Sequence, residues 1–159
     1  MKTDLTKEIE KKIFYRFNDK YGRGITAVFE CPIGKDYHNE FGIVDAISFN
    51  QTKDEFTCFE IKVSVADFHS KSKTTFVGNR NYYAMPLEIY EKVKKEIPAG
   101  IGCYVLKTTD IRGYYYFNCV KKCKPKTLEI NKEILLMNML RSARNKTNLS
   151  FYMKDTKNE

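Results

Sequence analysis

Two apolar segments in the first half of the chain, residues 42–49 and 56–63, are separated by the polar residues Asn50–Glu55. Both segments are rich in β-branched and aromatic side chains, which favour strands, and the polar residues between them are typical of a turn. The pattern predicts an antiparallel β-hairpin. This prediction constrains the fold most, because the register of a hairpin decides which side chains share a face of the sheet.

The register follows if the turn is centred between Thr52 and Lys53. The pairs that then lie opposite each other include Asn50 with Glu55, Ile47 with Cys58, and Asp45 with Glu60. Directly opposed residues share a face, and alternation adds Lys62 to the face of Glu60. The other face receives the apolar residues Val44, Ala46, Phe59, Ile61 and Val63. We therefore expect two carboxylates and an ammonium group together at one end of the hairpin.

Like charges placed opposite each other on a sheet cost stability, so Asp45 and Glu60 need a physical reason to be there. A hard divalent cation supplies one, since Mg²⁺ binds carboxylates, retains waters and accepts phosphate oxygens. Such an ion polarises a phosphoryl group and acidifies a bound water, which Lys62 would orient. The alternative is that Glu60 and Lys62 form a weak surface pair and that Asp45 belongs to ordinary turn chemistry.

Composition limits the kinds of protein that this chain can be. Its 159 residues fit one domain, and no apolar run approaches the roughly 20 residues of a membrane helix. The five cysteines lack a zinc-ligand pattern and are expected to be reduced, as in a soluble cytoplasmic protein. The net charge is +8, and residues 61–159 carry nineteen Lys/Arg against nine Asp/Glu. This basic part favours a polyanionic partner.

The remaining patterns predict a single mixed α/β domain. Helices are expected at residues 5–21, 64–74, 87–97 and from about 131 onwards, where apolar side chains recur at helical spacing or capping residues precede them. Further strands are expected at residues 25–31, 81–85, 101–106 and 114–120. No linker, repeat or low-complexity segment divides the chain. We assign the domain to residues 1–150 and expect a flexible tail at 151–159.

The residues of the hairpin also resemble a known family. Gly42-Ile43-Val44-Asp45 followed by Phe59-Glu60-Ile61-Lys62 is similar to the Asp…Glu-x-Lys signature of the PD-(D/E)xK nuclease superfamily. The continuation, through Val63–Phe68 and Asn81–Pro86, resembles the MmcB-like DNA-repair branch, which includes phage and mobile-element members. The resemblance covers about residues 25–106.

That resemblance implies a restriction-endonuclease-like core of α-β-β-β-α-β order, with a mixed sheet flanked by helices. It also implies hydrolysis of phosphodiester bonds in DNA with Mg²⁺ or Mn²⁺ as cofactor. By analogy Asp45, Glu60 and the backbone carbonyl of Ile61 would bind the metal. Lys62 would position or activate the attacking water.

Further acidic residues are candidates for supporting roles. Many members of the superfamily take an additional acidic ligand from the first helix or strand; we choose Glu30, on the strand beside the hairpin, over Glu10 on the first helix. Asp67 lies three residues after Ser64 and is expected to complete a helix cap. A role for Asp67 in supporting Lys62 or the metal is the alternative.

Basic residues that follow the second hairpin strand are candidates for contacts with DNA phosphates. We expect Lys71, Lys73 and Arg80 in this role. His69 shares a helix face with Lys73 and is placed near the metal site. A solvated helix face is the alternative for His69, Lys71 and Lys73.

Two other segments have an ordinary and a functional reading. The basic cluster Lys121–Lys126 would grip a phosphate backbone or form a charged turn, and we favour the turn. The aromatic run Tyr114–Phe117 would stack on bases or form a strand packed on both faces, and we favour the packed strand.

The function expected from the sequence is therefore a Mg²⁺-dependent deoxyribonuclease, an endonuclease rather than an exonuclease, in DNA repair or in DNA processing by phages and mobile elements. One alternative is a DNA-binding module that keeps the nuclease fold without cleaving. Another is a basic RNA-binding protein with incidental carboxylates. A homodimer is left open.

Overall fold

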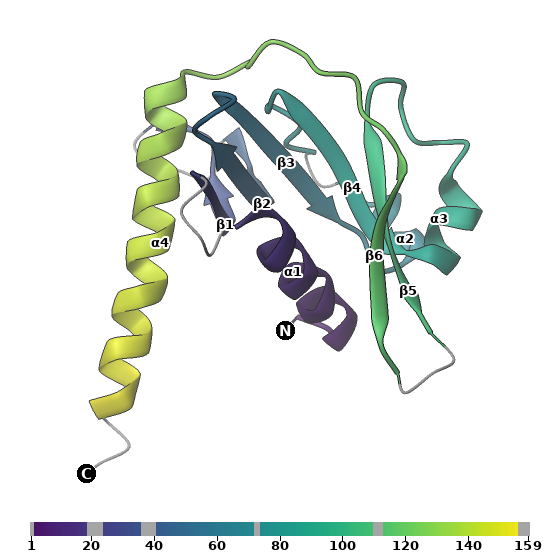
Figure 1. The fold of residues 1–159 in the computed structure, drawn as a ribbon, viewed down its shortest axis with the longest axis horizontal. Coiled ribbons are helices and arrows are strands. Elements are labelled where there is room, and N and C mark those ends of the chain that lie inside the picture. Colours follow the sequence, from purple (N-terminus) through teal and green to yellow (C-terminus); the bar gives the residue numbers. More distant parts are fainter. Residues whose placement is uncertain (1, 19–23, 36–40, 72–73, 110–112, 156–159) are drawn as a thin grey trace.

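The computed structural model describes residues 2–18, 24–35, 41–71, 74–109 and 113–155, with residues 146–155 described as backbone only. The strands are β1 (Ile25–Pro32), β2 (Ile43–Asn50), β3 (Glu55–Ile61), β4 (Arg80–Pro86), β5 (Gly102–Thr108) and β6 (Tyr115–Lys121). The helices are α1 (Asp4–Phe17), α2 (Val65–Phe68), α3 (Leu87–Val93) and α4 (Lys132–Asp155). The strands form one sheet in the order β1-β2-β3-β4-β5-β6, with helices on both faces (Figure 1).

Strand direction sets which ends of the strands meet. The first three strands form an antiparallel meander, β4 and β5 run parallel to β3, and β6 returns antiparallel to β5. Parallel neighbours need a crossover, and α2 and α3 lie in the two crossover segments. The carboxyl ends of β3, β4 and β5 therefore share one edge of the sheet. The predicted α/β class, with a mixed sheet flanked by helices, is confirmed.

The hairpin of β2 and β3 has the predicted register, with Asn50 opposite Glu55 and Ile47 opposite Cys58. Backbone pairing extends as far as Ala46 and Phe59. At the next position the two strands no longer pair through their backbones. A side chain of β2, instead of the backbone of β2, bonds to β3. The two candidate carboxylates lie at this point.

One apolar residue of the hairpin lies on the opposite face from the predicted one. The residues that pack beneath α1 as expected are Ala46, Phe59, Ile61 and, in part, Val63. Val44 instead packs in the cluster covered by α4, so its prediction was wrong. The cause lies in β1, where Glu30 has a φ of 52°, in the left-handed region, and interrupts the alternation of side chains. Phe29 therefore packs on the α1 face and Cys31, which pairs with Val44, on the α4 face.

Helix α1 lies across one face of the sheet (Figure 1). Its apolar stripe recurs every four residues and consists of Leu5, Ile9, Ile13 and Phe17. Thr3 caps its first turn. The helix ends at Phe17 rather than at Tyr21, because Asn18 is extended and its side chain accepts a hydrogen bond from the backbone N–H of Ala27 in β1 at 3.1 Å.

The other face of the sheet is covered in two parts. Leu135 and Met139 of α4 pack over β1, β2 and β3, and α3 packs over β4 and β5. Helix α4 continues to Asp155, so residues 151–155 of the expected tail are helical, and it extends past the edge of the sheet (Figure 1). Helices α2 and α3 are both shorter than expected. No helix in the described part of the chain is long and apolar enough to cross a bilayer.

Candidate metal centre

Asp45 joins β2 to β3 through its side chain. Its Oδ2 accepts a hydrogen bond from the backbone N–H of Ile61 at 2.7 Å, where the two strands have stopped pairing through their backbones. Burial raises the pKa of Asp45, while the Ile61 N–H and the positive charge of Lys62 lower it by less. The carboxylate is thus held rigidly and is costly to ionise.

Glu60 is buried, with only 5% of its surface exposed. Its Oε1 accepts a hydrogen bond from the backbone N–H of Thr75 at 2.9 Å and another from the Thr75 hydroxyl. Burial and, second, the negative charge of Asp45 raise the pKa of Glu60 to about 7. The structure therefore brings the two predicted carboxylates within electrostatic reach of each other.

Ile61 presents its backbone polar groups toward β2. The backbone N–H of Lys62 bonds to the carbonyl of Ala84 in β4, so Lys62 faces β4 and its neighbour Ile61 faces the other way. The N–H and C=O of one extended residue point to the same side, and the Ile61 N–H reaches Asp45. The Ile61 carbonyl is therefore directed to the Asp45 side of β3, as its proposed role as a ligand requires.

The ammonium group of Lys62 is buried beside these acids, with 6% of its side chain exposed. Its Nζ lies 3.7 Å from Oδ1 of Asp67. The other oxygen of Asp67 accepts a hydrogen bond from the N–H of Val63 at 3.1 Å, and the N–H of Asp67 donates to Ser64 Oγ at 3.0 Å. Ser64 caps α2 as predicted, and Asp67 both closes this turn and faces Lys62.

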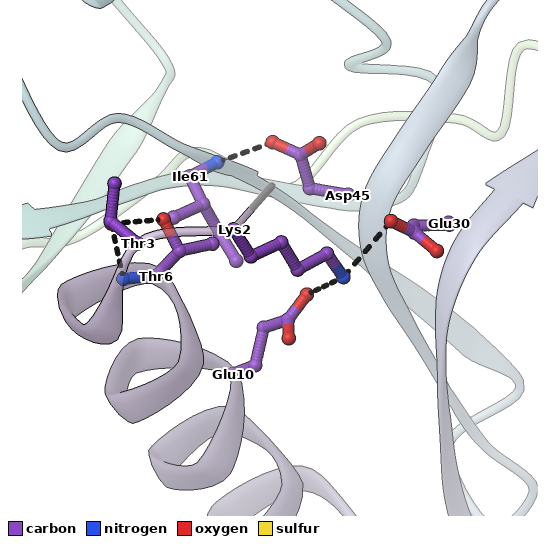
Figure 2. Close-up of polar contacts among 7 residues, drawn as sticks. All are labelled: Lys2, Thr3, Thr6, Glu10, Glu30, Asp45 and Ile61. Carbon is purple, nitrogen blue, oxygen red and sulfur yellow. Dashed lines mark hydrogen bonds and ion pairs between the residues drawn. The ribbon is translucent and has the colours of Figure 1, made fainter.

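Glu30 and Glu10, the two candidates for an additional acidic ligand, are bridged by Lys2 (Figure 2). Lys2 Nζ lies 2.9 Å from Glu30 Oε1 and 2.5 Å from Glu10 Oε1. Asp45 lies beside this group on the neighbouring strand, and the charge of Lys2 contributes to lowering the pKa of Asp45 against the larger effect of burial. The structure thus gathers acids from α1, β1 and β2 around one lysine.

Sequence reasoning missed Thr75, the residue that fixes Glu60. Thr75 is 1% exposed and lies in the segment between α2 and β4, fifteen residues from its partner. Gly42 leaves room for it: a Cβ on Gly42 would lie 2.7 Å from Thr75 Cγ2, and Gly42 has a φ of 105°. A lone threonine in a loop carries no spacing signal, so only the tertiary contact identifies it.

Arg80, one of the predicted phosphate-binding residues, does not lie at this centre. Arg80 lies opposite Thr57, three positions along β4 from the residue opposite Glu60, which corresponds to about 10 Å. It forms an ion pair with Glu55 at 2.9 Å. Lys71 is exposed after α2. Lys73 lies outside the described residues.

The shared helix face expected for His69 does not form, because α2 ends at Phe68 and His69 is its C-cap. His69 Nε2 lies 2.7 Å from Glu96 Oε2, on the segment after α3. Its described partner is therefore an acid at the protein surface rather than a residue of the candidate centre.

Neither the basic cluster nor the aromatic run has its predicted structure. Lys121 ends β6, and residues 122–128 form an irregular connection rather than the favoured turn. The side chains of Lys121 and Lys126 donate to backbone carbonyls of Ile97, Pro98 and Phe76. The prediction of an aromatic strand packed on both faces is wrong: Phe117 is buried, but Tyr116 is 60% exposed and Tyr114, just before the strand, 67%. The exposed face of β6 lies beyond α3, which covers β4 and β5 but does not reach the edge strand.

The donor set defines what the centre can hold. Within the described residues, no three His, Cys, Asp or Glu side chains are placed together so as to hold a metal ion. The available donors are the Asp45 and Glu60 carboxylates and the Ile61 carbonyl. Mg²⁺ and Mn²⁺ bind such oxygen donors and complete their coordination with water.

Comparison with known proteins adds no relative. No family model matches the chain, and neither the curated proteins nor the solved structures contain a match. Function is therefore inferred from the geometry of the site.

Proposed function

We propose that this chain is a Mg²⁺- or Mn²⁺-dependent deoxyribonuclease with a restriction-endonuclease-like core. The observation that carries the proposal is that the half-buried Asp45 repels the buried Glu60 beside the buried ammonium of Lys62. Burying charged groups together is expensive unless a counter-ion compensates them. The order α1-β1-β2-β3-α2-β4 also agrees with the core that the sequence resemblance implies.

The cost of the acid pair argues against a structural role. A buried carboxylate with a pKa near 7 destabilises the fold at neutral pH, because the unfolded chain ionises it without penalty. Hydrophobic residues at both positions would pack into the sheet without that cost. Groups with strongly perturbed pKa values that lie together are typical of functional sites.

The residues present fit a divalent metal ion. Asp45 and Glu60 each use one oxygen in a described hydrogen bond, and the Ile61 carbonyl faces the same side of β3 as Asp45. A bound Mg²⁺ would polarise the phosphodiester and acidify a coordinated water. The hydrogen bonds from Ile61 and Thr75 hold the carboxylates in place, so that little reorganisation is needed on binding.

Lys62 has the properties of a group that stabilises a reacting phosphate. Its ammonium is buried, and Asp67 restrains it from one side. From this position it would orient the attacking water or stabilise negative charge on the phosphoryl oxygens. The net charge of +8 suits a polyanionic substrate such as DNA, and we propose a role as an endonuclease in DNA repair or mobile-element DNA processing.

Cleavage and metal dependence test this proposal. Supercoiled, nicked and branched DNA are incubated with the wild type, Asp45→Asn and Lys62→Met, with Mg²⁺, with Mn²⁺ and with EDTA. Asp54→Asn and Lys53→Met, in the exposed turn of the same hairpin, are the matched controls. We expect cleavage with metal that both site variants lose and both controls keep. DNA binding without cleavage by the wild type would favour the non-cleaving module, and tighter binding to RNA at matched salt would favour the RNA-binding alternative.

A further inference from the structure

Lys2, whose side chain is 35% exposed, contacts carboxylates from two elements of the fold and lies near a third. Its Nζ contacts Glu10 of α1 at 2.5 Å and Glu30 of β1 at 2.9 Å, and Asp45 of β2 lies within its electrostatic reach (Figure 2). Burial lowers the pKa of Lys2. The hydrogen bonds to Glu10 and Glu30, together with the charges of these two residues, raise the pKa by more, so the net shift is upward. Lys2 is therefore a fixed positive charge at neutral pH.

Glu30, whose side chain is 53% exposed, has an unusual backbone conformation. Glu30 has a φ of 52°, which residues with a side chain rarely adopt and which is frequent at functional sites. The same residue interrupts the alternation of β1 and lies on the α1 side of the sheet, where Lys2 meets it.

We propose that the Lys2 ammonium holds the place of a second cation, so that the centre takes one divalent ion and one positive charge supplied by the chain. This inference rests on the proposed function, because it assumes that Asp45 and Glu60 bind a divalent ion. Lys2 pairs with Glu10 and Glu30, the acids that would otherwise hold or attract a further ion, and offsets one of their two negative charges. A bound ammonium also repels a second divalent ion at short range. Lys2 is thus a residue that sets metal stoichiometry and metal affinity.

Binding of Mn²⁺ to the DNA-free protein tests the proposal without relying on activity. Titration calorimetry and the electron paramagnetic resonance signal of free Mn²⁺ give the number of bound ions and their affinity. The variants are Lys2→Met, Lys2→Arg and Lys7→Met, with any purification tag at the C-terminal end. Lys7 lies on the same helix, is exposed and contacts only Asp4 at 3.5 Å among the described ion pairs, so it matches the change in charge.

We expect the wild type, Lys2→Arg and Lys7→Met to bind one Mn²⁺ per chain. Lys2→Met should bind a second Mn²⁺, or the first about tenfold more tightly, because a nearby positive charge is removed. Adding Glu30→Gln to Lys2→Met should abolish the gain. Circular dichroism and thermal unfolding verify that each variant is folded. If Lys2→Met does not fold, Lys2→Gln replaces it in the same measurements.

The outcomes separate this inference from the proposed function. One result would overturn the inference while the metal centre stands: the wild type binds Mn²⁺, Asp45→Asn does not, and Lys2→Met binds the same number of ions with the same affinity as the wild type. Lys2 would then only join α1 to β1. If neither the wild type nor Lys2→Met binds Mn²⁺, with or without DNA, both are overturned.

Discussion

Replacing Glu60 by Gln should make the metal-free protein more stable at pH 8. Gln keeps the size of the side chain, and its carbonyl oxygen can still accept the hydrogen bonds from Thr75. What it removes is a charge that is buried and repelled by Asp45. Functional sites of proteins commonly give up stability in this way.

The magnitude follows from the pKa of Glu60, which rises from an ordinary 4.5 to about 7 in the fold. Below pH 4.5 the group is protonated in both states and costs nothing. As pH increases from 4.5 to 7, the unfolded chain loses the proton first, so the free energy of unfolding falls. At about 1.4 kcal/mol per pH unit the full penalty above pH 7 is about 3 kcal/mol. For a chain of this size that corresponds to about 6–12 °C in Tm.

Urea and thermal unfolding of wild type and Glu60→Gln in EDTA, at pH 5 and pH 8, measure this effect. The advantage of the variant should be small at pH 5 and about 3 kcal/mol at pH 8. Glu91→Gln, at an exposed position paired with Lys94, should change stability by no more than about 0.5 kcal/mol at either pH. Adding Mg²⁺ at 100 times its Kd should stabilise the wild type by about 2.7 kcal/mol and leave Glu60→Gln unchanged.

A Glu60→Gln protein that is less stable than the wild type at pH 8 would refute the reasoning. So would an advantage of equal size at both pH values, because it would not depend on the ionisation of Glu60.

Three further predictions concern the support of Glu60. Thr75→Val removes the hydroxyl donor and should cost about 1–3 kcal/mol at pH 8 but less at pH 5 in urea unfolding, whereas the exposed Thr74→Val should be neutral. Gly42→Ala would place a side chain at a φ of 105° and a Cβ 2.7 Å from Thr75 Cγ2, so it should lower the free energy of unfolding by about 2–3 kcal/mol. Gly113→Ala should cost only about 1 kcal/mol, because φ there is 66° and the added Cβ would meet open space. Mn²⁺ affinity by calorimetry should fall about tenfold per pH unit below pH 7, since Glu60 must lose its proton to bind, and a pH-independent affinity between pH 5 and 7 would contradict its role as a ligand.

Local sequence determined the frame of the candidate centre. The alternation of apolar residues and the polar turn decided the register of β2 and β3, because a shift by one residue would reverse every side chain of a strand. That register set Asp45, Glu60 and Lys62 at one end of the hairpin. The cap at Ser64 could be predicted equally well, because capping depends on residues only three positions apart.

Contacts between distant segments decided the rest. The end of α1 depends on a hydrogen bond from β1 to Asn18, and the face of Val44 depends on the left-handed conformation of Glu30 in the neighbouring strand. The buried state of Glu60 depends on Thr75, which the chain brings back from a loop. Sequence patterns report interactions between residues a few positions apart, whereas burial, and with it the cost of a charge, is a property of the assembled tertiary structure.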